Sequence, residues 1–231
     1  MRAADSGWHG WTVRVAPEQE WIDLTHPISP DVPRLEKFAP PRIEKLSSMP
    51  EHPNSVTRLE MVCHTGTHLD APNHFVLGAP AIDEVPLERL HGPATVVHAH
   101  APPGGLIGPS DLDAASPQTG DIVILDTGWW LRPGDGDHPS LSEEAAWWLV
   151  KHGIKLLATD LPTPDLAVAR RGSDFDWPVH RILLRNGVLI GENLTNLGRL
   201  AARAEAMLLP LPIAGADGSP ARVLARNTVA G

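Results

Sequence analysis

The stretch SLSEEAAWWLVKHGIKLLAT at residues 140–159 decides the fold class. Ser140 and Glu143 have the spacing of a helix capping box, good helix formers follow them, and Gly153 stands where a left-handed residue often ends a helix. These signals predict a helix over residues 140–152. The apolar residues after Gly153 predict a buried strand that runs to the end of the stretch. Strand and helix patterns in alternation are typical of an α/β fold.

Two further strands and a short helix are predicted upstream of this stretch. Residues 94–99 and the sequence DIVILD at residues 121–126 are apolar runs, and we interpret both as strands. Between them, Ser110 is a favourable N-cap for a short helix over residues 111–116, which Pro117 ends. The predicted order supports a single compact domain of α/β class.

The N-terminal part of the chain is less regular. Residues 1–20 mix glycine, proline and charge, and we expect an arm outside a domain that spans residues 21–231. Residues 21–24 predict a first short strand. Seven prolines within residues 27–54 predict a long ordered or gating loop. Strand character returns at residues 55–63, where apolar and polar side chains alternate.

The segment around Asn186 and Gly187 has two interpretations. An Asn-Gly pair between apolar runs predicts a two-residue hairpin, in which His180 and Glu192 would point to opposite faces of the sheet. Alternatively, a helix begins near Pro178 and ends at Gly187, and a strand follows it. We favour the helix followed by a strand, which leaves the two polar side chains free to approach each other.

The densest group of chemically active side chains is HTGTHLDAPNHF at residues 64–75. It holds His64, His68, Asp70 and His74, directly after a predicted strand. A glycine and a proline inside the segment argue against a helix, and a loop held by them can fold several ligands around one point. Imidazoles with one carboxylate suit Zn²⁺, Mn²⁺ or Fe²⁺ and leave coordination positions open for water and substrate. The pattern therefore predicts a catalytic metal site.

Composition excludes several classes of protein. The 231 residues are 42% hydrophobic and 20% charged, which predicts a packed core. A single cysteine, Cys63, excludes an internal disulfide framework and a multi-cysteine zinc site. The net charge of −9 disfavours nucleic acid as a partner. We found no apolar run long enough for a membrane span, no secretory signal pattern and no serine-hydrolase or phosphate-loop motif, so we expect a cytoplasmic protein without a membrane partner.

Residues 64–75 match the HxGTHxDxPxHF signature and thereby resemble the cyclase superfamily, which includes bacterial kynurenine formamidase and isatin hydrolase. The resemblance runs from residue 21 to residue 213. Within it, DTGWW at residues 126–130, TDLPTPD at residues 159–165 and HRILLRNGVLIGENLTNL at residues 180–197 are similar to later family segments.

The resemblance implies a swivelling β/β/α fold with one or two divalent ions, zinc or manganese. It implies hydrolysis of a small cyclic or aryl amide, imide or lactone by metal-activated water, in a homodimer or homotetramer. A biosynthetic cyclase or dehydratase with the same Lewis-acid centre is the alternative activity. A binding protein without catalysis is a third reading, which the presence of His74 disfavours.

The resemblance also assigns roles to individual residues. It implies that His74 is a general base or acid beside the metal. The implied metal ligands are His64, His68 and Asp70, with His180 and Glu192 completing a second site. The predicted substrate contacts are Trp21, Phe75, Trp129 and Asp160.

Overall fold

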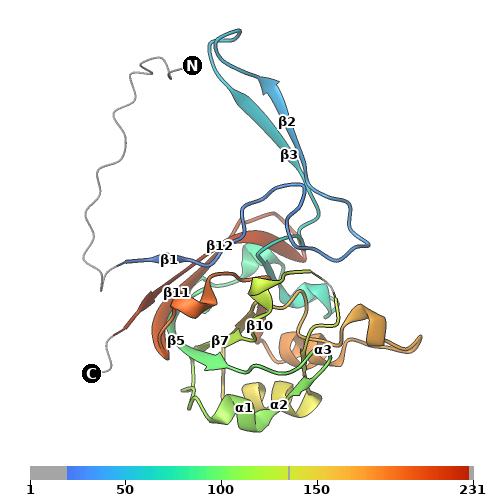
Figure 1. Ribbon diagram of the computed structural model, residues 1–231, viewed down its shortest axis with the longest axis vertical. Helices are drawn as coiled ribbons and strands as arrows, with labels where there is room; N and C mark the ends of the chain where they lie inside the picture. Colours follow the sequence, from blue (N-terminus) through green and yellow to red (C-terminus); the bar gives the residue numbers. More distant parts are fainter. Residues whose placement is uncertain (1–19, 135, 229–231) are drawn as a thin grey trace.

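The computed structural model describes residues 20–134 and 136–228, and its centre is a mixed eight-stranded sheet (Figure 1). Strand β4 pairs with both β10 and β12, so seven of the strands form a closed ring to which β1 is appended. Strands β5, β7, β9 and β10 run parallel, and the other pairings are antiparallel. In sheet order the strands are β1 (Ile22–Asp23), β12 (Gly218–Asn227), β11 (Arg203–Pro210), β5 (His91–His98), β7 (Ile122–Asp126), β9 (Leu156–Thr159), β10 (Leu189–Glu192) and β4 (His68–Asp70).

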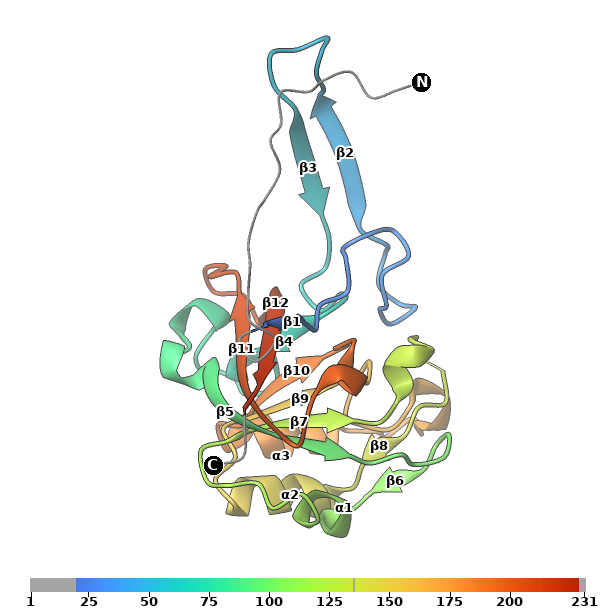
Figure 2. The same cartoon turned by 60° about the vertical axis from the view of Figure 1, so that its left-hand side comes forward.

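Each parallel strand is buried on both faces, and β7 shows how. Its Ile122 and Ile124 face the interior of the closed sheet, whereas Val123 and Leu125 face a second core under the helices. This alternation explains why the strand reads as a continuous apolar run. The helices that cover the outer face, beneath the sheet in Figure 2, are α1 (Pro109–Asp113), α2 (Glu143–Lys151) and α3 (Pro178–Arg185). The α/β fold class is confirmed.

In the described part of the chain, six short 3-10 helices connect these elements. They are η2 (Pro72–His74), η3 (Ile82–Glu84), η4 (Leu87–Arg89), η5 (Trp129–Leu131), η6 (Val168–Arg170) and η7 (Leu197–Arg199). The strands predicted at residues 94–99, 121–126 and 154–159 are present as β5, β7 and β9. The first predicted strand is present as β1.

The start of helix α2 differs from the prediction. Ser142, not Ser140, is its N-cap, and the Ser142 side chain accepts a hydrogen bond of 3.2 Å from the Ala145 amide. Ser140 instead belongs to β8 (Ser140–Leu141), which pairs in parallel with β6 (Leu106–Ile107). The sequence offers two serines ahead of the helix, and the pairing with β6 decides between them.

Helix α1 also begins earlier than predicted. Its N-cap is Gly108, whose amide donates to the Asp111 carboxylate at 2.8 Å, and Pro109 takes the first helical position. Proline is favoured there because its missing N–H is not needed. Ser110 is therefore inside the helix, and the prediction that it caps residues 111–116 is wrong.

A β-hairpin joins part of the predicted loop at residues 27–54 to the strand predicted at residues 55–63, which is present as β3 (Val56–Glu60). It consists of β2 (Arg42–Ser47) and β3 (Val56–Glu60), and it projects from the body of the molecule (Figures 1 and 2). The prolines lie ahead of β2 or in the turn, so none interrupts the ladder. Strand β3 ends at Glu60 and every residue in it is exposed, so the alternation at residues 55–63 does not reflect a buried face.

The helix-then-strand interpretation of the segment around Gly187 is confirmed. Trp177 is the N-cap of α3, Gly187 has a φ of 75°, and β10 follows. The hairpin alternative is wrong because β10 pairs with β9 and β4 instead.

Two predictions concern the ends and the surroundings of the chain. The arm predicted for residues 1–20 lies outside the described residues apart from Glu20, and the domain boundary at residue 21 stays a prediction. Within residues 20–134 and 136–228, no helix combines the length and apolar character needed to cross a bilayer.

Candidate metal centre

Strand β4 and its neighbours bring the polar cluster together. His64 lies in the loop before β4, and His68 and Asp70 are two residues apart on β4 and therefore share one face. Strand β10 places Glu192 directly opposite His68 in the antiparallel register. His180 comes from α3, which packs outside the same strand. Sequence positions more than 100 residues apart thus meet at one point.

The carboxylate of Asp70 is shared by two groups of donor atoms. Its Oδ1 lies 2.7 Å from Nδ1 of His64 and 3.4 Å from Nε2 of His68. Its Oδ2 lies 3.4 Å from Nε2 of His180, which in turn lies 3.3 Å from Oε1 of Glu192. Asp70 thus belongs to two triads of candidate ligands, one with His64 and His68 and the other with His180 and Glu192. The ligand atoms of each triad lie within 4.8 Å of one another. One shared carboxylate between two triads is an arrangement that can hold one or two cations.

Buried atoms without a hydrogen-bond partner show that the cluster fits a cation. Nε2 of His68 and Oε1 of Glu192 are both buried and both lack such a partner. Nδ1 of His68 donates to the Gly66 carbonyl at 2.8 Å, so in the neutral ring Nε2 carries the lone pair. Oε2 of Glu192 lies 3.3 Å from Nε2 of His68, and Oε1 lies 3.3 Å from Nε2 of His180. Buried lone pairs and carboxylate oxygens in such an arrangement are costly without a positive charge among them, which a bound cation would supply.

Asp165 orients His180 and was not identified from the sequence. Its Oδ2 accepts a hydrogen bond of 2.5 Å from Nδ1 of His180, and its carboxylate also accepts from the amides of Val179 and His180. The imidazole therefore presents Nε2 to Asp70 and Glu192. Asp165 is the last residue of the segment TDLPTPD, which resembles the family. Nothing in that segment indicates that Asp165 contacts the start of helix α3, 13 residues later.

His74 and Asp217 form a second pair beside the first triad. Nδ1 of His74 lies 3.1 Å from Oδ2 of Asp217, and the His74 ring stacks on His64 with centroids 4.0 Å apart. The same Asp217 oxygen lies 3.0 Å from Nε2 of His64, without hydrogen-bond alignment. Asp217 directly precedes β12, and no sequence pattern linked it to residues 64–75.

The cluster is strongly coupled electrostatically. Burial disfavours the protonated form of His68, but Asp70 and Glu192 outweigh it and raise the pKa of His68 to about 10. Burial likewise opposes ionisation of Asp70, yet His64 and His180 hold the pKa of its carboxyl well below its usual range. Burial lowers the pKa of His74. The carboxylates of Asp70 and Glu192 thus attract positive charge, whereas burial favours the neutral form of His74, which can act as a base.

The comparisons with known proteins agree with this geometry. The family model described as "Putative cyclase" matches residues 22–166, more than half of the chain. The chain belongs to the cyclase family. A kynurenine formamidase from Bordetella petrii is 32% identical over 212 residues, which cover 89% of this chain and 97% of the relative.

Solved structures show the same fold for this cyclase-family chain. Isatin hydrolase A from Labrenzia aggregata, bound to benzyl benzoate, superposes with a TM-score of 0.81 at 26% identity, covering 91% of this chain and 94% of that one. A potential metal-dependent hydrolase with cyclase activity has a TM-score of 0.75 at 26% identity and covers 91% and 99%. The resemblance read from residues 64–75 is confirmed, and the cyclase-family chain is a metal-dependent hydrolase.

A cavity of about 150 Å³ adjoins the metal centre of this cyclase-family protein. Its lining includes metal-centre residues together with Phe75, Trp177 and Arg171. The ring centroid of Phe75 lies 4.8 Å from that of His180 and 6.2 Å from that of Trp177. The cavity therefore has an aromatic wall beside the cluster, and Phe75 is where a substrate contact was predicted.

Three other predicted substrate contacts are not among the described residues that line this cavity. The ring of Trp21 lies under the Arg226 guanidinium at 4.9 Å. Trp129 is buried in the outer core. Asp160 accepts hydrogen bonds from Thr127 and the Trp130 amide at the start of η5, and burial raises its pKa to about 6. In the structure these three side chains pack around η5 and the closed sheet, and their contact with a substrate stays a prediction.

Proposed function

We propose that this protein hydrolyses the C–N bond of a small aryl or cyclic amide. The observation that carries the proposal is the Asp70 carboxylate shared by two ligand triads, with His74 beside them and an aromatic cavity in front. The relatives named above, a kynurenine formamidase and an isatin hydrolase, support an amide as the substrate class.

The residues present fit a divalent cation, and zinc or manganese is the proposed ion. His64, His68 and Asp70 would hold one ion, and Asp70 would share a second with His180 and Glu192. When bound, such an ion lowers the pKa of water towards neutrality and polarises a carbonyl group. The buried atoms without partners at His68 and Glu192 support this assignment.

His74 is the proposed proton carrier. Its Nδ1 donates to Asp217, which leaves Nε2 free to accept a proton from the attacking water. The C–N bond then breaks, and the same Nε2 returns the proton to the leaving nitrogen. Because burial keeps the pKa of His74 below its ordinary value, the imidazole is neutral and competent as a base at neutral pH.

Isotope labelling tests this proposal. The metal-loaded protein is incubated with a formylated aryl amine, isatin or a simple aryl lactone in ¹⁸O-water. Hydrolysis places one ¹⁸O atom in the carboxylate product. Turnover without label, through ring closure or loss of water, would support the alternative biosynthetic cyclase or dehydratase. Elemental analysis and anomalous diffraction at the metal edge identify the ion and distinguish one site from two.

We also propose that two copies of the chain associate through the β2–β3 hairpin. A lone two-stranded hairpin is marginally stable in water, and this one exposes several large apolar side chains. They are Ile43 (44% exposed), Leu46 (48%), Met49 (63%), Val56 (41%) and Leu59 (48%). Light scattering should give at least twice the chain mass, and a variant with Ile43 and Leu59 both changed to Ser should shift towards monomer.

Location in the cytoplasm stays a prediction, which cell fractionation tests.

A further inference from the structure

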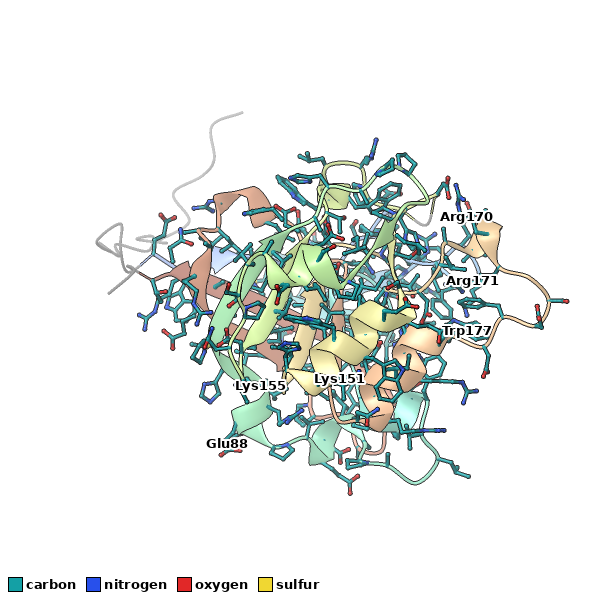
Figure 3. All side chains as sticks on the ribbon, turned by 90° about the horizontal axis from the view of Figure 1, so that it is seen from below. Glu88, Lys151, Lys155, Arg170, Arg171 and Trp177 are labelled. Atoms are coloured by element: carbon teal, nitrogen blue, oxygen red, sulfur yellow. The ribbon has the colours of Figure 1, made fainter. Side chains whose placement is uncertain are left out.

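Arg171 is a cation that faces the same cavity as the metal centre. It lies between η6 and α3, and its Nε donates to the Leu166 carbonyl at 2.8 Å. Figure 3 shows Arg171 and Trp177 on the segment that projects beside α3. The side chain lines the cavity together with His180 and Glu192. A positive group is thus fixed a short distance from the proposed reaction centre.

The guanidinium of Arg171 lacks a partner at one nitrogen. Its Nη2 is buried and makes no hydrogen bond. Asp165 and Glu192 attract the charge of Arg171 but accept no hydrogen bond from it, since Asp165 binds His180 and Glu192 faces His68 and His180. A donor on a charged group is costly to leave unpaired, and the Arg171 side chain lines the cavity, so its guanidinium is suited to turn towards an anionic acceptor that a ligand brings.

Aromatic rings hold this cation in place. The guanidinium carbon lies 4.9 Å from the ring centroid of Phe175 and 5.4 Å from that of Trp177. Trp177 has a φ of 46°, an uncommon backbone conformation for a tryptophan, and such strain is often found at functional sites. The cavity therefore combines an aromatic wall with a preoriented cation, which matches a planar ring that carries a carboxylate.

We propose that Arg171 is a specificity-determining residue that binds a carboxylate on the aromatic part of the substrate. This inference rests on the proposed function, because it narrows the substrate class to anionic aryl amides. Arg171 contacts the substrate away from the bond that breaks, so its contribution is to binding and orientation. The neighbouring Arg170 is exposed and paired with Asp137, and it provides a matched control.

Equilibrium binding without turnover tests the inference. The metal-loaded protein is titrated with 2-aminobenzoate and with its neutral counterpart 2-aminobenzamide, both followed by their own fluorescence. The wild type should prefer the anion. Arg171→Gln should weaken 2-aminobenzoate about 10- to 100-fold, the loss of a charge-assisted hydrogen bond, and change 2-aminobenzamide less than about twofold. Arg170→Gln should change neither.

Several outcomes overturn the inference. Equal affinity of the wild type for 2-aminobenzoate and 2-aminobenzamide would overturn it. An Arg171→Gln variant that still prefers 2-aminobenzoate would also overturn it, because the carboxylate would then bind at the metal. Arg171→Lys guards against a folding defect: it keeps the charge but not the forked geometry, so it should retain a reduced preference for the anion. Because no bond is broken in this experiment, its result is independent of whether the protein cleaves the C–N bond of an amide.

Discussion

His68 and Glu192 are directly opposed residues of the antiparallel β4–β10 pair, and their Nε2 and Oε2 atoms are 3.3 Å apart. Both residues are buried, and neither strand can shift by one position without turning its ligand to the other face. The central part of the metal centre is therefore set by strand register rather than by a flexible loop. Sites built on strands hold their geometry more tightly than sites built on loops.

His74→Ala should lower kcat by about 10²–10⁴-fold, the usual contribution of a positioned proton carrier, while metal content stays close to the wild-type value. Because burial lowers the pKa of His74, the acid limb of the wild-type kcat/KM profile should lie below pH 6.5, and the variant should lose that limb. Steady-state kinetics with elemental analysis measure both. Loss of metal in His74→Ala would make His74 a ligand instead.

Asp165→Asn should weaken metal binding about 10- to 100-fold, because the His180 ring loses the carboxylate that fixes its orientation. Asp160→Asn is the matched control. Asp160 is equally buried and lies in the same segment, but it binds Thr127 and the Trp130 amide rather than an imidazole. The control should lower the melting temperature and leave metal affinity unchanged. Equal loss of metal in both variants would contradict the orienting role of Asp165.

The metal-free protein should lose stability as the pH rises from 6.5 towards 10. The pKa of His68 is about 10 in the folded chain and 6.5 when unperturbed, so its contribution is complete below pH 6.5 and disappears as the pH passes the folded value. His64 and His180 have raised pKa values for the same reason, the neighbouring carboxylates. Thermal unfolding across this range measures the effect.

The metal-loaded protein is the control for this pH dependence. Imidazole ligands bind cations only after losing their protons, so metal affinity should rise over the same range. The melting temperature of the loaded protein should therefore not follow the decline of the metal-free form. A metal-free melting temperature that stays flat between pH 6.5 and 10 would show that the imidazoles are not held protonated by Asp70 and Glu192.

The sequence predicted the parts of the site that are close along the chain. His64, His68, Asp70 and His74 lie within eleven residues, and their chemistry can be read from composition and spacing alone. The succession of helix α3 and strand β10 was predicted from Pro178, which is favoured at the start of a helix, and from Gly187, which takes the left-handed conformation after it. Local signals were sufficient in both cases because each depends on backbone conformations that few residue types favour.

The residues that were missed depend on long-range pairing. Asp217 reaches His74 because β12 pairs with β4, and Asp165 reaches His180 because the start of α3 returns to it. Strand β2 was missed for another reason: the prolines of residues 27–54 suggested a loop throughout, although none lies within β2. Its partner β3 lies inside the strand predicted at residues 55–63. Such pairings are set by tertiary packing, which a single sequence does not display.

Gly218→Ala should disturb the metal centre without changing any ligand. Gly218 opposes Asp70 in the β12–β4 pairing, and a methyl group there would lie 2.7 Å from Cε1 of His64 and 2.8 Å from the Leu69 carbonyl oxygen. The backbone oxygen cannot move cheaply, so we expect a loss of about 1–3 kcal/mol in the free energy of unfolding and a displaced His64. Denaturant unfolding and metal content measure the two effects.

Gly108→Ala is the matched control for this last variant, because a methyl group at Gly108 meets only the Asp111 carboxylate, at 3.9 Å. It should keep full metal content. If Gly218→Ala binds metal as tightly as the control does, then His64 tolerates displacement. The ion would in that case be held chiefly by the triad that Asp70 forms with His180 and Glu192, in which no atom approaches Gly218 as closely as the His64 ring does.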